Sequence, residues 1–317
     1  MDTLSDGGVG SGFAPGDRVA DAEGEAVNDS DAREDDLRRR VAKFVRREGY
    51  PLEMGVGLDL LNCGWAVYHS APYADPTSGE VRAADIYTSK RFLASERCAV
   101  RVALAVECKF SRGRPWVAVR GPTSSAEWAR SVPTFAFADG VGRRFVSGIP
   151  GAESVLETGR CCHALSQLPV SRSEAGGNPG EDQENKGKRG LDSAYQAQRQ
   201  AIAAAYGFTK TADSRIVHGP NVEVVAVIPV VVVDGDLFEF QVELDGSDSV
   251  TRVSQVWVRA SAPGDAEATQ LICVAVRGEV VAVANRFSMA LAQLLSGQEG
   301  RLDKFVAMET PLGWLPR

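Results

Sequence analysis

The run VALAVECKF at residues 102–110 is apolar except for one acid, Glu107, and one base, Lys109. Its content of Val, Leu and Ala predicts a strand with buried faces. Because side chains alternate between the two faces of a strand, Glu107 and Lys109 share one face, whereas Val106 and Cys108 lie on the other. A carboxylate and an ammonium are costly to bury unless they pair or bind something. The run therefore indicates either a structural ion pair at a strand end or part of a functional site.

Composition limits the classes of protein to consider. The chain has 317 residues, of which 44% are hydrophobic and 24% charged, so it can bury the core of one large domain or two small ones. The formal net charge of −7 excludes a polycation. A nucleic-acid partner would therefore have to meet a local basic patch, or a divalent metal that neutralises the acids.

The six cysteines form no CxxC pair, and several lie in apolar runs. This predicts reduced, buried thiols and a cytoplasmic location. The triplet Cys161-Cys162-His163 is only a weak metal signal, because adjacent ligands lack a distant partner pair. No secretory signal opens the chain and no apolar run reaches about 18 residues, so we expect a protein that neither is exported nor spans a membrane.

The order of the predicted elements indicates an α/β fold with one mixed β-sheet flanked by helices. Residues 1–34 are polar and acidic and predict a disordered tail. The main domain then covers 35–317, with a flexible insertion at 171–190 and a C-terminal strand and helix extension from 237. Within the domain, helices are expected at 35–48, 50–63, 124–131, 191–206 and 286–295, and strands at 65–70, 81–92, 98–110, 115–120, 222–233, 237–244, 252–260 and 270–276.

Three acids and one base are expected at the same end of this sheet. Glu53 lies in the first turn of a helix, Asp85 on the strand at 81–92, and Glu107 with Lys109 on the next strand. A hairpin between the two strands can bring Asp85 beside Glu107. Clustered carboxylates repel one another unless a hard cation such as Mg²⁺ lies among them. Lys109, kept charged by these acids, could then orient a water or stabilise charge on a phosphoryl oxygen.

Several short motifs accompany these charged residues: GW at 64–65, YxD at 73–75 with SGE at 78–80, RAADI at 82–86, VECK at 106–109 and PW at 115–116. Together they resemble the restriction-endonuclease-like, or PD-(D/E)XK, nuclease superfamily. Its members carry an acid on a helix, an Asp near the end of one strand and Glu-x-Lys on the next, and the helix around Gln198 with the following buried strand is similar to the later part of their core.

The resemblance implies a restriction-endonuclease-like mixed sheet and hydrolysis of phosphodiester bonds in DNA, or less readily in RNA. It assigns metal binding to Glu53, Asp85, Glu107 and the backbone carbonyl of Cys108. The expected cofactor is Mg²⁺, for which Mn²⁺ could substitute. The catalytic residues would be Glu53, Asp85, Glu107, Lys109 and Gln198. Defence against foreign DNA and DNA repair both fit such an activity.

Other interpretations stay open for each feature. The fold could serve a catalytically inactive binding or scaffold protein in which the charged residues are a residual ion-pair network. Glu53 could serve only the positive end of its helix, and Gln198 could be an ordinary polar residue on a helix face. Residues 237–317 could read the substrate, extend the sheet or form the surface of a homodimer.

Overall fold

The computed structural model describes residues 23–96, 98–110, 114–121, 136–137, 161–168, 193–213, 222–262, 265–301 and 303–304. The chain divides into two units, residues 1–47 and 48–317. The first unit contains helix α1, Glu23–Arg47, which starts earlier than the sequence predicts and extends into the segment assigned to the tail. Further along the helix, Glu34 and Arg38 form an ion pair one turn apart, at 2.6 Å.

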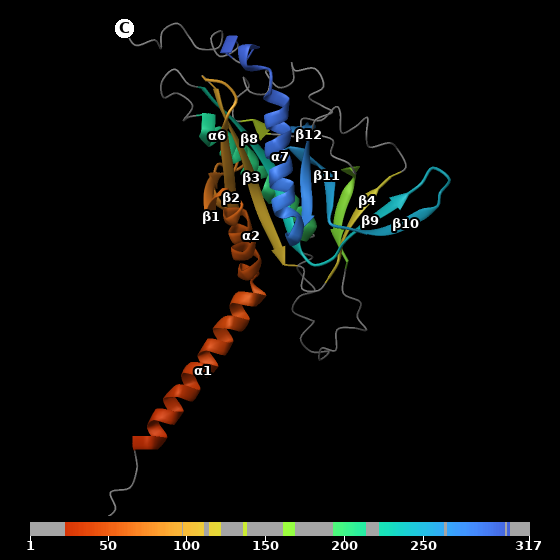
Figure 1. The fold of residues 1–317 in the computed structure, drawn as a ribbon. Coiled ribbons are helices and arrows are strands. Elements are labelled where there is room, and N and C mark those ends of the chain that lie inside the picture. Colours follow the sequence, from red (N-terminus) through yellow and green to blue (C-terminus); the bar gives the residue numbers. More distant parts are fainter. Residues whose placement is uncertain are drawn as a thin grey trace, which may run out of the picture. The chain divides into compact units, whose positions relative to one another are not determined.

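The second unit contains all the remaining described elements (Figure 1). In chain order they are α2 (Tyr50–Asn62), β1 (Ala66–Ala74), β2 (Val81–Leu93), β3 (Cys98–Phe110), β4 (Trp116–Arg120), β5 (Ala136–Phe137), β6 (Cys161–Cys162), β7 (Ala164–Gln167), α6 (Ser193–Asp213), β8 (Val222–Asp234), β9 (Leu237–Val242), β10 (Asp248–Val253), β11 (Gln255–Ala262), β12 (Asp265–Val276), η2 (Arg277–Glu279) and α7 (Val280–Leu295).

The large sheet is mixed, as the sequence predicts. Its strand order is β1-β2-β3-β8-β12-β11-β6, and β5 pairs with β8 off this path. β1, β2 and β3 form an antiparallel meander, whereas β8 runs parallel to both β3 and β12. β3 and β8 stay in register over their whole length, from Cys98 opposite Val222 to Phe110 opposite Asp234. These two strands therefore form the buried centre of the sheet.

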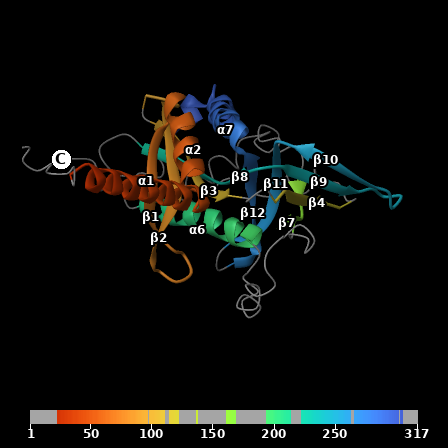
Figure 2. The same ribbon diagram turned by 90° about the horizontal axis from the view of Figure 1, so that it is seen from below.

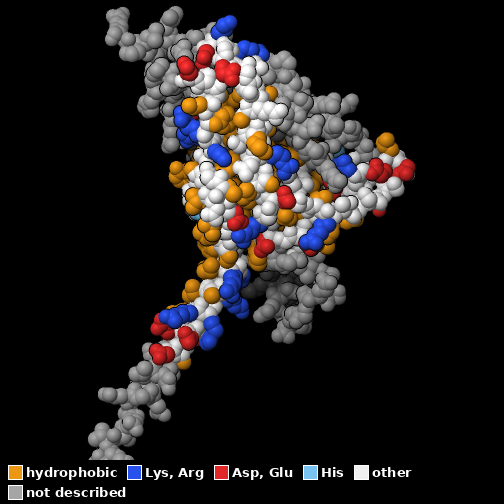
Figure 3. Space-filling model, viewed as in Figure 1, with side chains coloured by type: hydrophobic (Ala, Val, Ile, Leu, Met, Phe, Trp, Pro, Cys, Tyr) orange, Lys and Arg blue, Asp and Glu red, His pale blue; other side chains and the backbone are white. Residues whose placement is uncertain are grey.

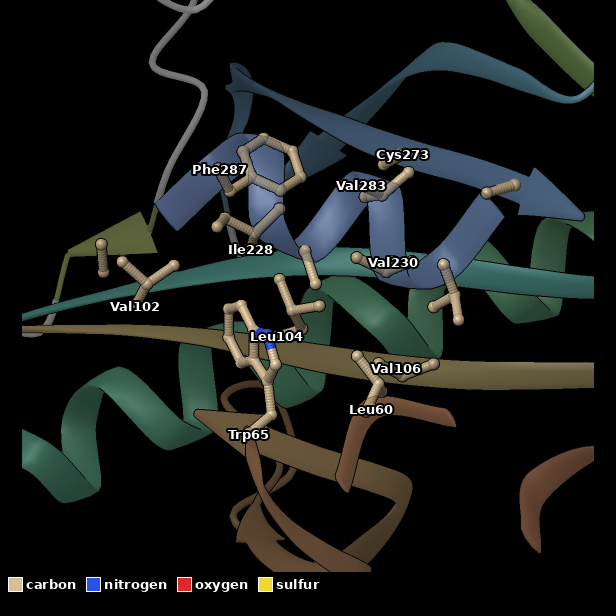
Figure 4. Packing of buried hydrophobic residues seen from close by; sticks show 14 of the residues in the cluster. Leu60, Trp65, Val102, Leu104, Val106, Ile228, Val230, Cys273, Val283 and Phe287 are labelled. Atoms are coloured by element: carbon tan, nitrogen blue, oxygen red, sulfur yellow. The ribbon is translucent and has the colours of Figure 1, made fainter. Parts of the chain in front are cut away.

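Helices cover both faces of the large sheet, with α2 and α7 on one side and α6 on the other (Figure 2). α7 presents buried residues at helical spacing, including Val283, Phe287 and Leu291, to its side of the sheet. The close-up of this side shows how helix and strand residues meet (Figure 4). The labelled residues are Leu60, Trp65, Val102, Leu104, Val106, Ile228, Val230, Cys273, Val283 and Phe287.

The prediction of a single sheet is wrong, because β4 and β9 belong to a second, four-stranded sheet of order β10-β9-β4-β7. The sequence places β4 directly after β3 and so suggests that they are neighbours. However, β2 and β8 occupy the two edges of β3, so β4 has no edge there to join. It pairs instead with β9 in parallel and with β7 antiparallel.

Several predicted elements are confirmed, notably the helix from Tyr50 and the strands at 98–110 and 222–233. The helix predicted to stop at Gly207 continues to Asp213. At Gly207 the missing side chain serves packing, because a Cβ there would lie 2.7 Å from the Ala74 carbonyl oxygen. The predicted helix at 124–131 and the insertion at 171–190 lie outside the described residues.

The prediction for the cysteines is largely confirmed, since none of the six forms a disulfide and only Cys63 is exposed. No helix in the described ranges combines the length and the apolar character needed to cross a membrane.

Candidate active site

Glu107 and Lys109 lie on the face of β3 that α6 covers, as the alternation of the strand predicts. The Lys109 Nζ donates to the Glu107 Oε1 at 2.6 Å and to the Gln200 Oε1 at 3.0 Å. The Glu107 side chain is 7% exposed and that of Lys109 is 25% exposed. Val106 and Cys108 pack into the cluster on the opposite face, beneath α2 and α7. The pair is therefore mostly buried but keeps the ammonium in contact with solvent.

Asp85 lies at the point where β2 and β3 stop pairing. The last paired residues are Ile86 and Val106, and one residue further on the Asp85 Oδ2 accepts a hydrogen bond of 2.7 Å from the Cys108 backbone N–H. In a regular antiparallel ladder that N–H would donate to a β2 carbonyl. The Asp85 carboxylate thus takes the place of one rung, and the Cys108 carbonyl, which points to the same edge as its N–H, faces the same gap.

Burial raises the pKa of Asp85, although the Cys108 N–H and the Lys109 charge act in the opposite direction. Keeping the half-buried Asp85 carboxyl ionised costs free energy, although its hydrogen bond favours the ionised form. A bound cation would offset this free-energy cost.

Glu53 reaches the site from α2, on the other face of the sheet. α2 begins after Gly49, whose φ of 86° turns the chain, and Pro51 occupies its first turn. Leu52 and Val56 anchor the helix in the core, which fixes where Glu53 stands. Burial, followed by the negative charge of Asp85, raises the pKa of Glu53 to about 7, and the Lys109 charge opposes this shift.

Glu107 is subject to the same combination of forces. Burial raises its pKa to about 7, and the charges of Asp85 and Glu53 add to the shift, whereas Lys109 opposes it. Three acids from α2, β2 and β3 therefore repel one another around a single base. The set concentrates negative charge, and it could attract a cation or hold shared protons.

The described side-chain positions do not by themselves form a metal-binding shell. Among the described residues, no group of three or more His, Cys, Asp and Glu side chains is placed so that it could hold a metal ion. The ion pair explains part of this arrangement, because Glu107 is directed to Lys109. The predicted ligands thus share an electrostatic environment, while their carboxylates serve protein donors.

The structure does not bring Gln198 to Lys109. Gln198 is buried, and its Nε2 donates to the Ala194 carbonyl one turn earlier in α6 at 3.1 Å. The α6 glutamine that contacts the site is Gln200. The sequence contains glutamines at 196, 198 and 200, and only the packing of α6 against the sheet decides between them.

Tyr73 on β1 is a site neighbour that the sequence reasoning did not assign. It is 4% exposed, and its pKa is raised to about 12 by burial and then by the charges of Glu107, Asp75 and Asp85. Tyr73 therefore stays neutral and lines the α6 side of the acids. In the sequence, Tyr73 belongs to the YxD motif. The acid of this motif, Asp75, accepts hydrogen bonds from the backbone N–H groups of Thr77 and Ser78 and so holds the turn that follows β1.

Cys161 and Cys162 face opposite sides of the large sheet, because the first packs in the cluster with α7 and the second in the cluster with α6. Burial raises the pKa of the Cys161 thiol to about 11, which disfavours the thiolate that binds metal. Cys161 and Cys162 therefore act as core residues on opposite faces rather than as paired ligands, whereas His163 is exposed.

No protein-family model, no curated protein and no solved structure matches this chain.

Proposed function

We propose that this protein is a metal-dependent nuclease that hydrolyses phosphodiester bonds in DNA. The observation that carries the proposal is the position of Asp85. Its carboxylate replaces a rung between β2 and β3, beside Cys108, and its charge acts on both Glu53 and Glu107. An acid held in the gap between two strands, with further acids from both faces of the sheet, is suited to a hard divalent cation.

The order of elements supports the same proposal. The resemblance to the PD-(D/E)XK superfamily implies an acid on a helix, an Asp on one strand, Glu-x-Lys on the next, and then a helix and a buried strand. In this chain the acids lie in that order on α2, β2 and β3, and α6 and β8 follow. β8 also runs parallel to β3 and is buried along its centre.

The chemistry of the donors fits Mg²⁺ or Mn²⁺, since carboxylate and carbonyl oxygens are the ligands that these ions prefer. Asp85 and Glu107 would hold the ion, assisted by Glu53 and the Cys108 carbonyl. When bound, such an ion polarises a phosphate and lowers the pKa of an attached water. Because Lys109 already pairs with Glu107, the ammonium and the cation would compete for this carboxylate.

Lys109 would supply the positive charge for the reaction itself. Its ammonium is the exposed part of the pair, and Gln200 holds it from α6. From this position it would donate to the attacking water or to a phosphoryl oxygen as negative charge develops there. Tyr73 would line the α6 side of this group as a neutral side chain.

Cleavage of plasmid and single-stranded DNA tests the proposal, with Mg²⁺ or Mn²⁺ and with EDTA as the metal-free reference. We expect Asp85→Ala to abolish cleavage and Lys109→Ala to lower the rate roughly 10²–10³-fold, the effect of removing one charge-stabilising donor. Glu223→Gln, which alters an acid of β8 beside the beginning of β3, is the matched control and should cleave normally. Cleavage that survives in both site variants would refute the assignment.

A second candidate function is a binding or scaffold protein that keeps the fold without catalysis. Two observations favour it: the described acids do not form a three-ligand group, and Lys109 is already engaged by Glu107 and Gln200. In addition, the face drawn in Figure 3 shows basic and acidic side chains interspersed, with acids at the tip of the β9–β10 hairpin, rather than a continuous basic stripe. Nucleic-acid binders usually carry such a stripe.

Thermal denaturation with Mn²⁺ distinguishes the two candidates. The nuclease predicts a rise in Tm with Mn²⁺ that disappears in Glu107→Ala. The scaffold predicts no Mn²⁺ response in either protein.

A further inference from the structure

Ser70 on β1 has an unusual backbone conformation at a position opposite Asp85. Among the residues that the structure describes, it is the one non-glycine with a positive φ, at 49°. The β1–β2 register pairs His69 with Ile86 and Ala71 with Ala84, which puts Ser70 across from Asp85, although these two residues form no ladder pair. A non-glycine residue in the left-handed region is strained, and strain of this kind persists only where the surroundings impose it.

The alternation of β1 reverses at Ser70. Before it, Val67 and His69 point towards α2, since a Cβ on Gly57 would lie 3.4 Å from the Val67 Cγ1 and 2.4 Å from the His69 Cε1. After it, Tyr73 points towards α6, where it packs against Phe208 with ring centroids 5.7 Å apart. In a regular strand, residues 67, 69 and 73 would all share one face. The chain therefore rotates between His69 and Tyr73.

The alternation of β2 reverses at the same rung. Ala84 packs in the cluster with α6, whereas Ile86, two residues later, packs in the cluster with α2. Tyr87 lies on the α6 side, with its ring 4.5 Å from that of Phe208. In both strands, the alternation between side chains that face α2 and side chains that face α6 is thus reversed at the Ser70–Asp85 rung. A shared reversal is a local twist of the hairpin rather than an irregularity of one strand.

The reversal decides where the Asp85 carboxylate lies. On a regular strand its side chain would stand on one face of the sheet, close to either Glu53 or Glu107 but not to both. At a rung where the faces exchange, the side chain instead points along the sheet towards β3, where it accepts from the Cys108 N–H. This explains how its charge acts on acids from both sides.

We propose that Ser70 is a positioning residue for Asp85: its left-handed conformation twists the β1–β2 hairpin so that the Asp85 carboxylate enters the gap between β2 and β3. A small residue is suited to this role, because β-branched side chains strongly disfavour a positive φ. The role of Ser70 in placing Asp85 does not depend on the proposed function. The importance of this placement for metal binding and cleavage rests on the proposed function.

The amide of Cys108 reports this placement directly. In an NMR spectrum, selective labelling with ¹⁵N-cysteine gives the amide signals of only six residues. Comparison with Cys108→Ser identifies the signal of Cys108. Asp85→Ala defines the signal of an amide that has lost its side-chain acceptor. We compare wild type with Ser70→Gly, which accepts the same φ without strain, and with Ser70→Val, which does not.

We expect Ser70→Gly to leave the Cys108 signal and its hydrogen exchange unchanged. Ser70→Val should move the signal to the Asp85→Ala position and speed its exchange about tenfold or more, because a hydrogen bond to a charged acceptor is lost. The signals of Cys161 and Cys273, on other strands, verify that the variant is folded. If Ser70→Val does not fold, Ser70→Ala, which disfavours the same φ less strongly, should give a smaller shift in the same direction. An unchanged Cys108 signal in a folded Ser70→Val or Ser70→Ala protein would overturn the proposal.

DNA cleavage by the same variants separates this inference from the proposed function. If both hold, Ser70→Gly cleaves as wild type does and Ser70→Val loses activity together with the Cys108 signal. If wild type does not cleave but the Cys108 signal still follows Ser70, the positioning role stands and the nuclease proposal fails. If a Ser70→Val protein whose Cys108 signal has moved cleaves DNA at the wild-type rate, the placement of Asp85 by Ser70 is not needed for cleavage.

Discussion

The two ends of β3 handle charge in opposite ways. At its beginning, Arg101 pairs with Glu223 of β8 at 3.0 Å, and Arg91 of β2 reaches the same acid at 2.9 Å. Here two bases enclose one acid. At its end, three acids act on one another around the single base Lys109. The first set has one more base than acid, whereas the second has two more acids than bases.

The neighbouring strand shows that the fold does not require this excess. In the β3–β8 register, Glu107 lies beside Val231 and Lys109 beside Val233. β8 therefore crosses the same end of the sheet with apolar side chains that are fully buried. Since charge at this level is costly and β8 lacks it, the sheet does not need the charged end of β3, which supports the proposed ligand site.

The largest effect is expected when charge is placed on β8. Val231→Glu would add an acid beside Glu107 without a base to pair with it, and the free energy of unfolding should fall by about 3–5 kcal/mol. The matched control is Val225→Glu, which places the same side chain next to Arg101. Urea denaturation should show a clearly smaller loss for the control, and equal losses would mean that the two ends do not differ.

The next effect is a pH-dependent gain in stability for Glu107→Gln. The pKa of Glu107 is about 7, above its ordinary value of 4.5, so the folded state holds this proton more tightly than the unfolded state. Wild type therefore loses stability as the pH rises from 4.5 through 7, and the cost is fully present above 7. The variant lacks this cost and should be more stable by about 1–3 kcal/mol above about pH 8.

Below the pKa of the unfolded chain, this contribution vanishes, because Glu107 is protonated in both states. The two proteins should therefore converge in acid. Denaturation curves at several pH values test this, and a difference that does not change with pH would contradict the raised pKa.

A smaller effect is expected from the glutamines of α6. Gln200→Ala removes an acceptor from Lys109, a contact worth about 1–2 kcal/mol, and should lower any cleavage rate about tenfold or less. Gln198→Ala is the control, since Gln198 bonds within its own helix. It should affect Tm but not the cleavage rate at a temperature where both proteins are folded. If Gln198→Ala lowered the cleavage rate and Gln200→Ala did not, Gln198 rather than Gln200 would be the glutamine that acts in the site.

The smallest effect is expected at the beginning of β3. Glu223→Gln weakens pairs whose arginines are 55% and 39% exposed, so the loss in stability should stay below about 1 kcal/mol. The loss should shrink further in high salt, which screens exposed charges. A larger, salt-independent loss would show that this end too is a buried and critical network.

The sequence predicted the central elements well because their signals are local. The apolar runs at 102–110 and 222–233 predicted buried strands, and Pro51 with Glu53 marked the start of α2. The approach of Asp85 to β3 followed from the hairpin between β2 and β3. These features depend on patterns within a few residues or on neighbouring strands.

The features that the sequence did not predict depend on distant contacts. β4 joins β9, more than a hundred residues later, because both edges of β3 are already paired. Gln200 rather than Gln198 contacts Lys109 because the packing of α6 sets its rotation. Nothing in the residue type of Ser70 announces a positive φ, which arises from the shared twist of two strands.

Calorimetric titration with Mn²⁺ tests most directly whether the acids at the end of β3 form a cation site. We predict one saturable site in the wild-type protein that is lost in Asp85→Asn and retained in Glu223→Gln. If wild type takes up no Mn²⁺ at millimolar concentrations, or if Asp85→Asn binds it as wild type does, the negative charge at this end of the strand serves another purpose.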